Sequence, residues 1–140
     1  MSQKPFKILG IEHVGIAVDD LNRISDIFGD LLGLELCSRE KIDDQQVITD
    51  IYKTGSGKLE FLKATDENSP ISRFIDKKGG GIHHIALIVD DIDVALNFLK
   101  GKNINLVNSK PKIGAEGYKI AFIHPDSTGG ILIELCQKED

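Results

Sequence analysis

The chain lacks several features that would direct it to a membrane or to an oxidising compartment. Its 140 residues include no tryptophan and only two cysteines, Cys37 and Cys136. A chain of this length buries an adequate core without disulfides, so we expect two free thiols. No apolar run approaches the roughly 20 residues of a membrane span, and the N-terminal MSQKPFKILG lacks the apolar segment of a signal peptide. These absences predict a cytoplasmic protein with no membrane partner.

Positive charge is scarce as well. Lysine and arginine together number 17 against 22 acidic residues, which gives a net charge of −5, and the lysines are scattered. Because nucleic acids and anionic lipids are recognised by clustered basic residues, neither is an expected partner. A hydrophobic fraction of 41% and a charged fraction of 28% are ordinary for a globular protein. We therefore expect a single domain over residues 8–140 that acts on a small molecule.

An internal repeat is the most informative feature that the chain does contain. Residues 11–21, IEHVGIAVDDL, align without a gap with residues 82–92, IHHIALIVDDI, and five of the eleven positions are identical. Each segment is an apolar strand pattern that ends in Asp-Asp, after which the apolar period changes from two to about 3.6 residues. A strand followed by a helix is therefore predicted twice.

The two copies continue in the same way. In the first, Asp19 or Asp20 caps a helix that stops at Gly33, and the apolar face of this helix consists of Leu21, Ile24, Phe28, Leu31 and Leu32. In the second, Asp90 or Asp91 caps a helix that stops at Gly101, and its apolar face consists of Ile92, Ala95, Leu96 and Leu99. Extended segments follow at about 34–40, 45–54 and 57–64, and at about 104–108, 118–124 and 130–136.

These patterns predict an α+β fold of two pseudo-symmetric βαβββ modules, at about 8–66 and 82–137. Between them a linking helix is predicted at about 69–81, because Ser69-Pro70 is a good helix start and a run of three glycines ends it. Two copies are too few for a solenoid, so we expect the modules to pair around a shared cleft.

Two histidines occupy equivalent positions in the repeat. Alternate side chains of a strand project to opposite faces, so His13 shares a face with the small residues Gly15 and Ala17, away from the large apolar side chains. His84 lies beside Ala86 in the same way. The duplication therefore predicts two imidazoles in symmetric, uncrowded positions.

Two glutamates repeat at nearly the same spacing. Glu60 stands between Leu59 and Phe61, and Glu134 stands between Ile133 and Leu135. A carboxylate inside an apolar strand is costly unless it is paired or bound to a metal. Together with the two histidines, these glutamates form a ligand set for one divalent cation that leaves coordination positions open for substrate.

The remaining candidate residues have plainer interpretations. His83 points to the opposite face from His84, which favours a structural role. His124 precedes Pro125 in a turn, which favours binding or structure over metal ligation. The glycines of KIGAEGYKIAFIHP are not followed by a helix, so they form no nucleotide-binding fingerprint.

Four segments carry a resemblance to a known family: HVGIAVDDL, SPISRFIDKKGGGIHHIALIV, KIGAEGYKIAFIHP and GGILIELCQ. From about residue 8 to residue 137 the chain resembles the vicinal oxygen chelate, or glyoxalase, superfamily, and the HHI, KIG and FIHP segments favour its methylmalonyl-CoA epimerases. The resemblance implies a curved, partly closed sheet and assembly as a homodimer. It also implies Co²⁺ or Mn²⁺ as the metal, with Zn²⁺, Ni²⁺ or Mg²⁺ as alternatives, bound by His13, Glu60, His84 and Glu134.

The implied reaction is the interconversion of the R and S forms of an acyl-CoA, methylmalonyl-CoA, through removal of the α-proton and a metal-stabilised enolate. Inversion requires one acid–base group on each face of the carbon. The resemblance assigns one of them to Glu134, since the family's ligand at this position is implicated in proton transfer. Several bacterial members carry a second glutamate where this chain has Thr49 in QQVITD, so the second group stays open among Asp44, Thr49 and Asp50.

Other activities of the superfamily are alternatives at this point. Glyoxalase I, a lactoylglutathione lyase, uses the same kind of metal shell to stabilise an enediolate. A related binding protein would sequester a small molecule in the same cleft without chemistry. An extradiol dioxygenase is less favoured, because its iron takes two histidines and one carboxylate and leaves more positions open.

Overall fold

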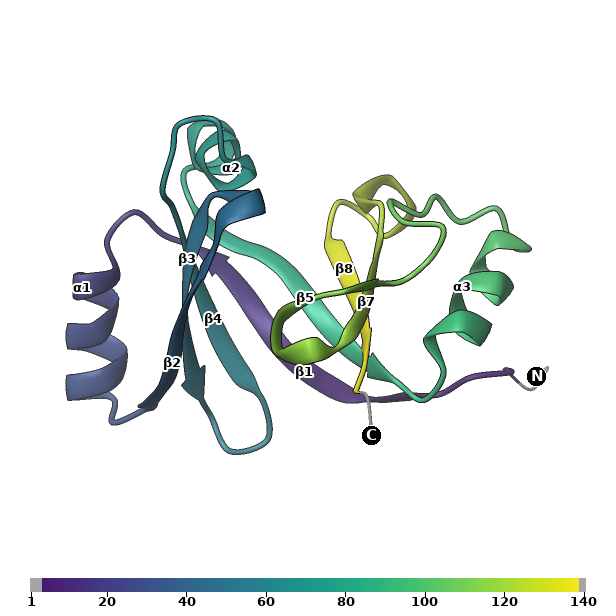
Figure 1. Ribbon diagram of the computed structural model, residues 1–140, viewed down its shortest axis with the longest axis horizontal. Helices are drawn as coiled ribbons and strands as arrows, with labels where there is room; N and C mark the ends of the chain where they lie inside the picture. Colours follow the sequence, from purple (N-terminus) through teal and green to yellow (C-terminus); the bar gives the residue numbers. More distant parts are fainter. Residues whose placement is uncertain (1–3, 139–140) are drawn as a thin grey trace. The chain divides into compact units, whose positions relative to one another are not determined.

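The computed structural model describes residues 4–138, which form two compact units (Figure 1). One unit is His13–His83, and the other combines residues 4–12 with residues 84–138. Strands β1 (Ile8–Ala17) and β5 (Gly81–Val89) each contribute residues to both units. No helix within the described residues is long and apolar enough to cross a membrane.

The His13–His83 unit is built on four strands in the order β2-β3-β4-β1. β1 and β4 are parallel, whereas β2, β3 and β4 are antiparallel neighbours. The remaining elements of this unit are β2 (Glu35–Ile42), β3 (Val47–Lys53), β4 (Lys58–Ala64), a helix formed by α1 (Leu21–Ile24) and the π-helical turn Ser25–Leu31, a 3-10 turn (Asp43–Gln45), and α2 (Pro70–Lys78).

Each face of this half-sheet is covered by a different helix. On one face Tyr52 and Phe61 pack with Leu21 of α1. On the other face Leu62 packs with Ile71 of α2. As predicted, Asp20 caps α1, Ser69 caps α2, and the left-handed Gly79 ends α2.

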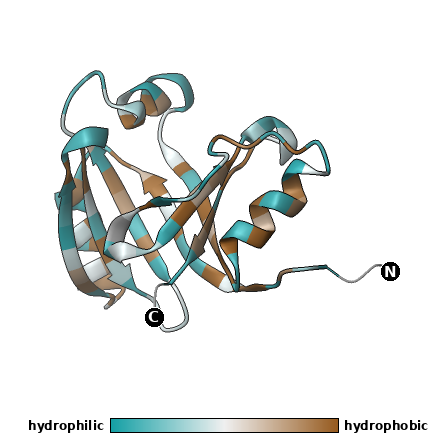
Figure 2. Cartoon of the chain, turned by 45° about the vertical axis from the view of Figure 1, so that its right-hand side comes forward, coloured by the Kyte–Doolittle hydropathy of each residue, from teal (hydrophilic) through white to brown (hydrophobic). Residues whose placement is uncertain are grey.

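The second unit repeats the arrangement with the order β5-β8-β7-β6. Its other elements are α3 (Ile92–Lys100), β6 (Lys112–Ile113), the 3-10 turns Ala115–Gly117 and Pro125–Ser127, β7 (Lys119–Ile123) and β8 (Leu132–Gln137). Asp91 caps α3, and alternating hydrophobic and hydrophilic bands mark this helix in Figure 2. Ile92, Ala95 and Leu96 form its buried face, as the sequence predicts.

The N-terminal segment packs onto this second unit, which the sequence did not indicate. The rings of Phe6 and Phe98 meet edge to face at 5.8 Å. The backbone N–H of Lys7 donates to Asp90 Oδ1, and the N–H of Asp90 donates to the carbonyl oxygen of Lys7.

The apolar face predicted for the first helix is wrong at its end, where Leu31 is 80% exposed and Leu32 is 61% exposed. The last turns are π-helical, with a hydrogen bond from Leu32 N to Ile27 O, so the side chains lose the 3.6-residue phase. A second bond, from Leu34 N to Phe28 O, turns the chain back, and Leu34 packs on the core instead.

The strand predicted at 104–108 is also wrong: this segment makes one isolated bridge, from Leu106 to Ile123. Asparagine side chains compete with a regular ladder, since Asn108 Oδ1 accepts the N–H of Phe122. The edge strand is instead the two-residue β6. The α+β fold of two βαβββ modules is confirmed, and Cys37 and Cys136 are free thiols as predicted.

Candidate functional site

The first histidine and the first glutamate of the repeat form a buried pair within the His13–His83 unit. β1 and β4 are in register with Gly15 opposite Glu60, two residues beyond His13. His13 Nδ1 lies 3.1 Å from Glu60 Oε2. The two residues are only 6% and 8% exposed.

The second histidine and glutamate form the matching pair in the other unit. β5 and β8 are in register with Ala86 opposite Glu134, again two residues beyond the histidine. His84 Nε2 lies 3.6 Å from Glu134 Oε1, and both residues are 7% exposed. The rings of His84 and Phe122 are nearly perpendicular, with centroids 6.1 Å apart. The repeat detected in the sequence therefore gives each unit one buried His–Glu pair, through Nδ1 in His13 and through Nε2 in His84.

Each pair offers two donor atoms that could bind a metal ion. Two ligand atoms bound at about 2.1 Å to one ion lie about 3.0 Å apart at right angles and about 3.4 Å apart at the tetrahedral angle. The nitrogen–oxygen separations of 3.1 Å and 3.6 Å are close to these values. Imidazole nitrogen with carboxylate oxygen suits Zn²⁺, Co²⁺, Mn²⁺ and related divalent ions. The buried side chains therefore fit a divalent cation.

The three candidates for a second acid–base group have different environments. Asp50 is fully buried and accepts two hydrogen bonds from Arg39, at 2.6 Å and 2.8 Å. These bonds, and the negative charge of Asp50, raise the pKa of the Arg39 guanidinium. Asp44 is exposed in the turn between β2 and β3. Thr49 is 2% exposed, and its hydroxyl has no hydrogen-bond partner among the described residues.

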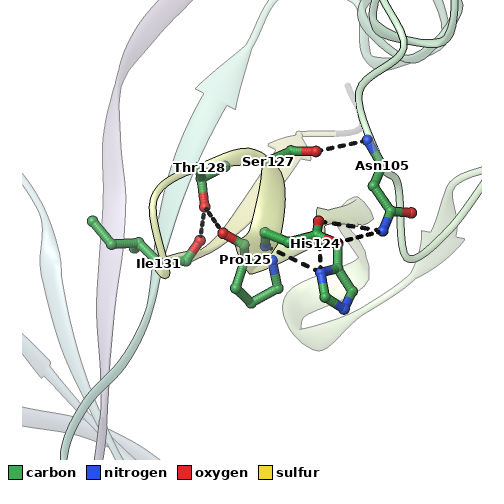
Figure 3. Close-up of polar contacts among 7 residues, drawn as sticks. Asn105, His124, Pro125, Ser127, Thr128 and Ile131 are labelled. Atoms are coloured by element: carbon green, nitrogen blue, oxygen red, sulfur yellow. Dashed lines mark hydrogen bonds and ion pairs between the residues drawn. The ribbon is translucent and has the colours of Figure 1, made fainter.

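The other two histidines make different contacts. The ring of His83 meets the ring of Phe74 edge to face at 5.0 Å, and burial lowers the pKa of its imidazole. His124 organises the turn after β7, where its Nδ1 accepts the backbone N–H of Asp126 (Figure 3). The Asn105 side chain donates to both oxygens of Asp126 in the same turn.

One buried acid was missed by the sequence reasoning. Glu12 is 5% exposed and directly precedes His13 in β1. A carboxylate oxygen of Glu12 lies within 4.8 Å of ligand atoms of both His13 and Glu60, so these three buried side chains form a group that could hold a metal ion. Glu12 stands between Ile11 and His13, so it lacks the two apolar neighbours that identified Glu60 and Glu134, and its position in a predicted strand was the only available signal.

Comparison with known proteins identifies the family of the chain. Residues 12–122 match the family model described as the Glyoxalase/Bleomycin resistance protein/Dioxygenase superfamily. The chain is 36% identical to the mitochondrial methylmalonyl-CoA epimerase of Mus musculus, with 97% of this chain and 77% of that protein covered. It is 37% identical to the ethylmalonyl-CoA/methylmalonyl-CoA epimerase of Cereibacter sphaeroides, with 91% and 96% covered.

The chain is also similar to solved structures of methylmalonyl-CoA epimerases. The methylmalonyl-CoA epimerase of Mycobacterium tuberculosis superposes with a TM-score of 0.89 at 32% identity, covering 100% of this chain and 93% of that one. A methylmalonyl-CoA epimerase in complex with methylmalonyl-CoA and NH4+ superposes with a TM-score of 0.86 at 28% identity, covering 94% and 96%. An epimerase is an isomerase, the enzyme class that the sequence predicted. The chain therefore belongs to the Glyoxalase/Bleomycin resistance protein/Dioxygenase superfamily and, within it, to the family of the methylmalonyl-CoA epimerases.

Proposed function

We propose that this protein is a metal-dependent epimerase that interconverts the R and S forms of methylmalonyl-CoA. The observation that carries the proposal is the presence of one buried His–Glu contact in each unit, at equivalent positions of the repeat. They occur in a chain that aligns over 97% of its length with a named methylmalonyl-CoA epimerase. The α-carbon of the substrate lies between a carboxylate and a thioester carbonyl, so its proton is acidic enough for removal by a positioned carboxylate.

We infer that the two pairs together hold one divalent cation, Co²⁺ or Mn²⁺ in the first place, with His13, Glu60, His84 and Glu134 as ligands. Four such donors leave coordination positions for oxygen atoms of the substrate. When bound there, a divalent ion supplies electrostatic stabilisation of the negative charge that develops as the α-proton leaves. The low exposure of the four side chains keeps competing water away from them.

Glu134 has a second role in this proposal, as the acid–base group on one face of the α-carbon. Its carboxylate accepts the α-proton of one epimer, and the electron pair of the C–H bond moves into the thioester carbonyl to form the enolate. Its carboxylic acid returns a proton to that same face in the reverse direction. Inversion also needs a group on the opposite face.

Deuterium exchange tests the function directly. The Co²⁺-loaded protein is incubated with methylmalonyl-CoA in D₂O, and the α-proton and the configuration are followed by NMR and by chiral analysis. Exchange and inversion well above the rate without enzyme are expected. Absence of both with every divalent metal would refute the proposal, and turnover of the glutathione–methylglyoxal adduct instead would establish the lyase alternative.

Metal content provides a matched test of the ligand set. The variant His84→Ala should lose bound metal, because one ligand of four is removed. The control His124→Ala removes a half-exposed histidine that belongs to a turn, and it should retain the metal. Equal metal content in the two variants would contradict the assignment.

A further inference from the structure

A buried hydroxyl without a partner marks an unusual position on β3. Thr49 is 2% exposed, and its Oγ1 makes no hydrogen bond to any described residue. Burying a hydroxyl in this way costs about 1–3 kcal/mol unless another group satisfies it. Such a cost is tolerated where a ligand or a neighbouring side chain receives the bond during function.

The strand register places a carboxylate beside this hydroxyl. β2 and β3 pair with Glu40 directly opposite Thr49. Directly opposite residues of an antiparallel pair have Cβ atoms about 4.5–5.5 Å apart and share one face of the sheet. Glu40 is half-buried, so its side chain is partly sheltered by the protein.

The registers of β2 with β3 and of β3 with β4 place Glu40 on the same face of the sheet as the first His–Glu pair. β3 and β4 pair with Thr49 opposite Leu62, and Leu62 is two residues beyond Glu60 in β4. Ile42, two residues beyond Glu40, packs in the cluster that contains Leu62. Alternation along each strand therefore assigns Glu40, Thr49 and Glu60 to one face of the His13–His83 unit.

The other acids near Thr49 are less suited to this face. Asp50 follows Thr49 and projects to the opposite face, where Arg39 binds both of its oxygens. Asp44 lies in the exposed turn that joins the two strands. Glu40 is the acid that the β2–β3 ladder places opposite Thr49.

We propose that Glu40 is the second acid–base group of the epimerisation, and that the unpartnered hydroxyl of Thr49 positions the Glu40 carboxylate by donating to it when substrate is bound. This inference rests on the proposed function. In one direction the Glu40 carboxylate takes the α-proton, the C–H electron pair becomes the enolate, and the carboxylic acid of Glu134 delivers a proton to the opposite face. In the other direction the roles reverse, so no additional reactant is consumed.

The test separates proton removal from inversion. Each pure epimer is incubated in D₂O with Co²⁺-loaded wild-type protein and with the variant Glu40→Gln, after metal content and circular dichroism have been matched. The wild type should exchange and invert both epimers. In the variant, inversion should fall about 10²- to 10⁴-fold, the usual contribution of a positioned acid–base group. One epimer should still exchange its α-proton with retention of configuration, because Glu134 remains, whereas the other epimer should not exchange.

Three further variants complete the design. Glu35→Gln removes an exposed carboxylate from the same strand and should leave inversion unchanged. Thr49→Val should lower kcat with little change in KM, as expected for a positioning residue. The double variant Glu40→Gln/Thr49→Glu moves the carboxylate to the adjacent strand and should recover part of the inversion.

The outcomes distinguish this inference from the proposed function. Undiminished inversion by Glu40→Gln would overturn the role of Glu40, and so would equal loss of exchange from both epimers in a folded, metal-loaded variant. Absence of exchange in the wild type would instead refute the epimerase assignment itself.

Discussion

Removal of Arg39 tests whether the buried carboxylate of Asp50 stabilises the fold through an ion pair. The Asp50 side chain is fully buried, whereas that of Arg39 is 53% exposed. Their contact is bidentate, with Arg39 Nε donating to Oδ1 at 2.6 Å and Nη2 donating to Oδ2 at 2.8 Å. The variant Arg39→Ala leaves an ionised carboxylate buried with neither of these donors.

The expected loss of stability follows from the difference in burial between the two side chains. Removing one partner of a buried ion pair costs about 3–5 kcal/mol, because the remaining charge is poorly solvated. Water already reaches the guanidinium of Arg39, so the lower end, about 3 kcal/mol, applies. For a chain of this length that loss corresponds to a decrease in Tm of about 10 °C. The double variant Arg39→Met/Asp50→Leu should recover most of it, because no buried charge remains.

Urea unfolding followed by far-ultraviolet circular dichroism measures the free energies, and deuterium exchange of methylmalonyl-CoA is measured on the same samples. The variant Asp50→Asn should be destabilised yet should exchange the substrate proton within about twofold of the wild-type rate, since an acid–base role would require a loss of about 10²-fold or more. A loss of stability below about 0.5 kcal/mol for Arg39→Ala would refute the energetic argument. A 10²-fold loss of exchange in folded Asp50→Asn would make Asp50 the base.

Two further predictions concern the helices. Ser69 caps α2, because its Oγ accepts the N–H of Ile71 at 3.2 Å. The variant Ser69→Ala should therefore lower the free energy of unfolding, measured by urea titration, by about 1 kcal/mol. Leu32→Gln should change stability by less than about 0.5 kcal/mol because Leu32 is exposed, whereas Leu21→Ala on the same helix should cost about 2–5 kcal/mol. Equal costs for these two leucine variants would contradict the π-helical ending of the first helix.

The features predicted successfully from sequence depend on local patterns. The Asp-Asp caps and the change of apolar period are contained within a few residues, and they located β1, β5 and the helices after them. Alternation along β3 places Asp50 on the opposite face from Thr49, and Arg39 binds Asp50 on that opposite face. Duplication supplied the strongest signal, because it related His13 to His84 without knowledge of the fold.

The features that were missed depend on contacts between distant parts of the chain. Neither the π-helical turn nor the packing of Phe6 on Phe98 has a periodic signature. Glu40 was not considered, because its relation to Thr49 exists only through the β2–β3 register. The pair Glu40–Thr49 is fixed by the turn between Ile42 and Val47, whose length the sequence alone does not define.

Anomalous diffraction from crystals grown with Co²⁺ would show whether the two buried His–Glu pairs hold one divalent cation. We expect one strong cobalt peak per chain, about 2.0–2.3 Å from nitrogen atoms of His13 and His84 and from carboxylate oxygens of Glu60 and Glu134. Cobalt bound only at other residues, or separate peaks at the two pairs, would contradict it.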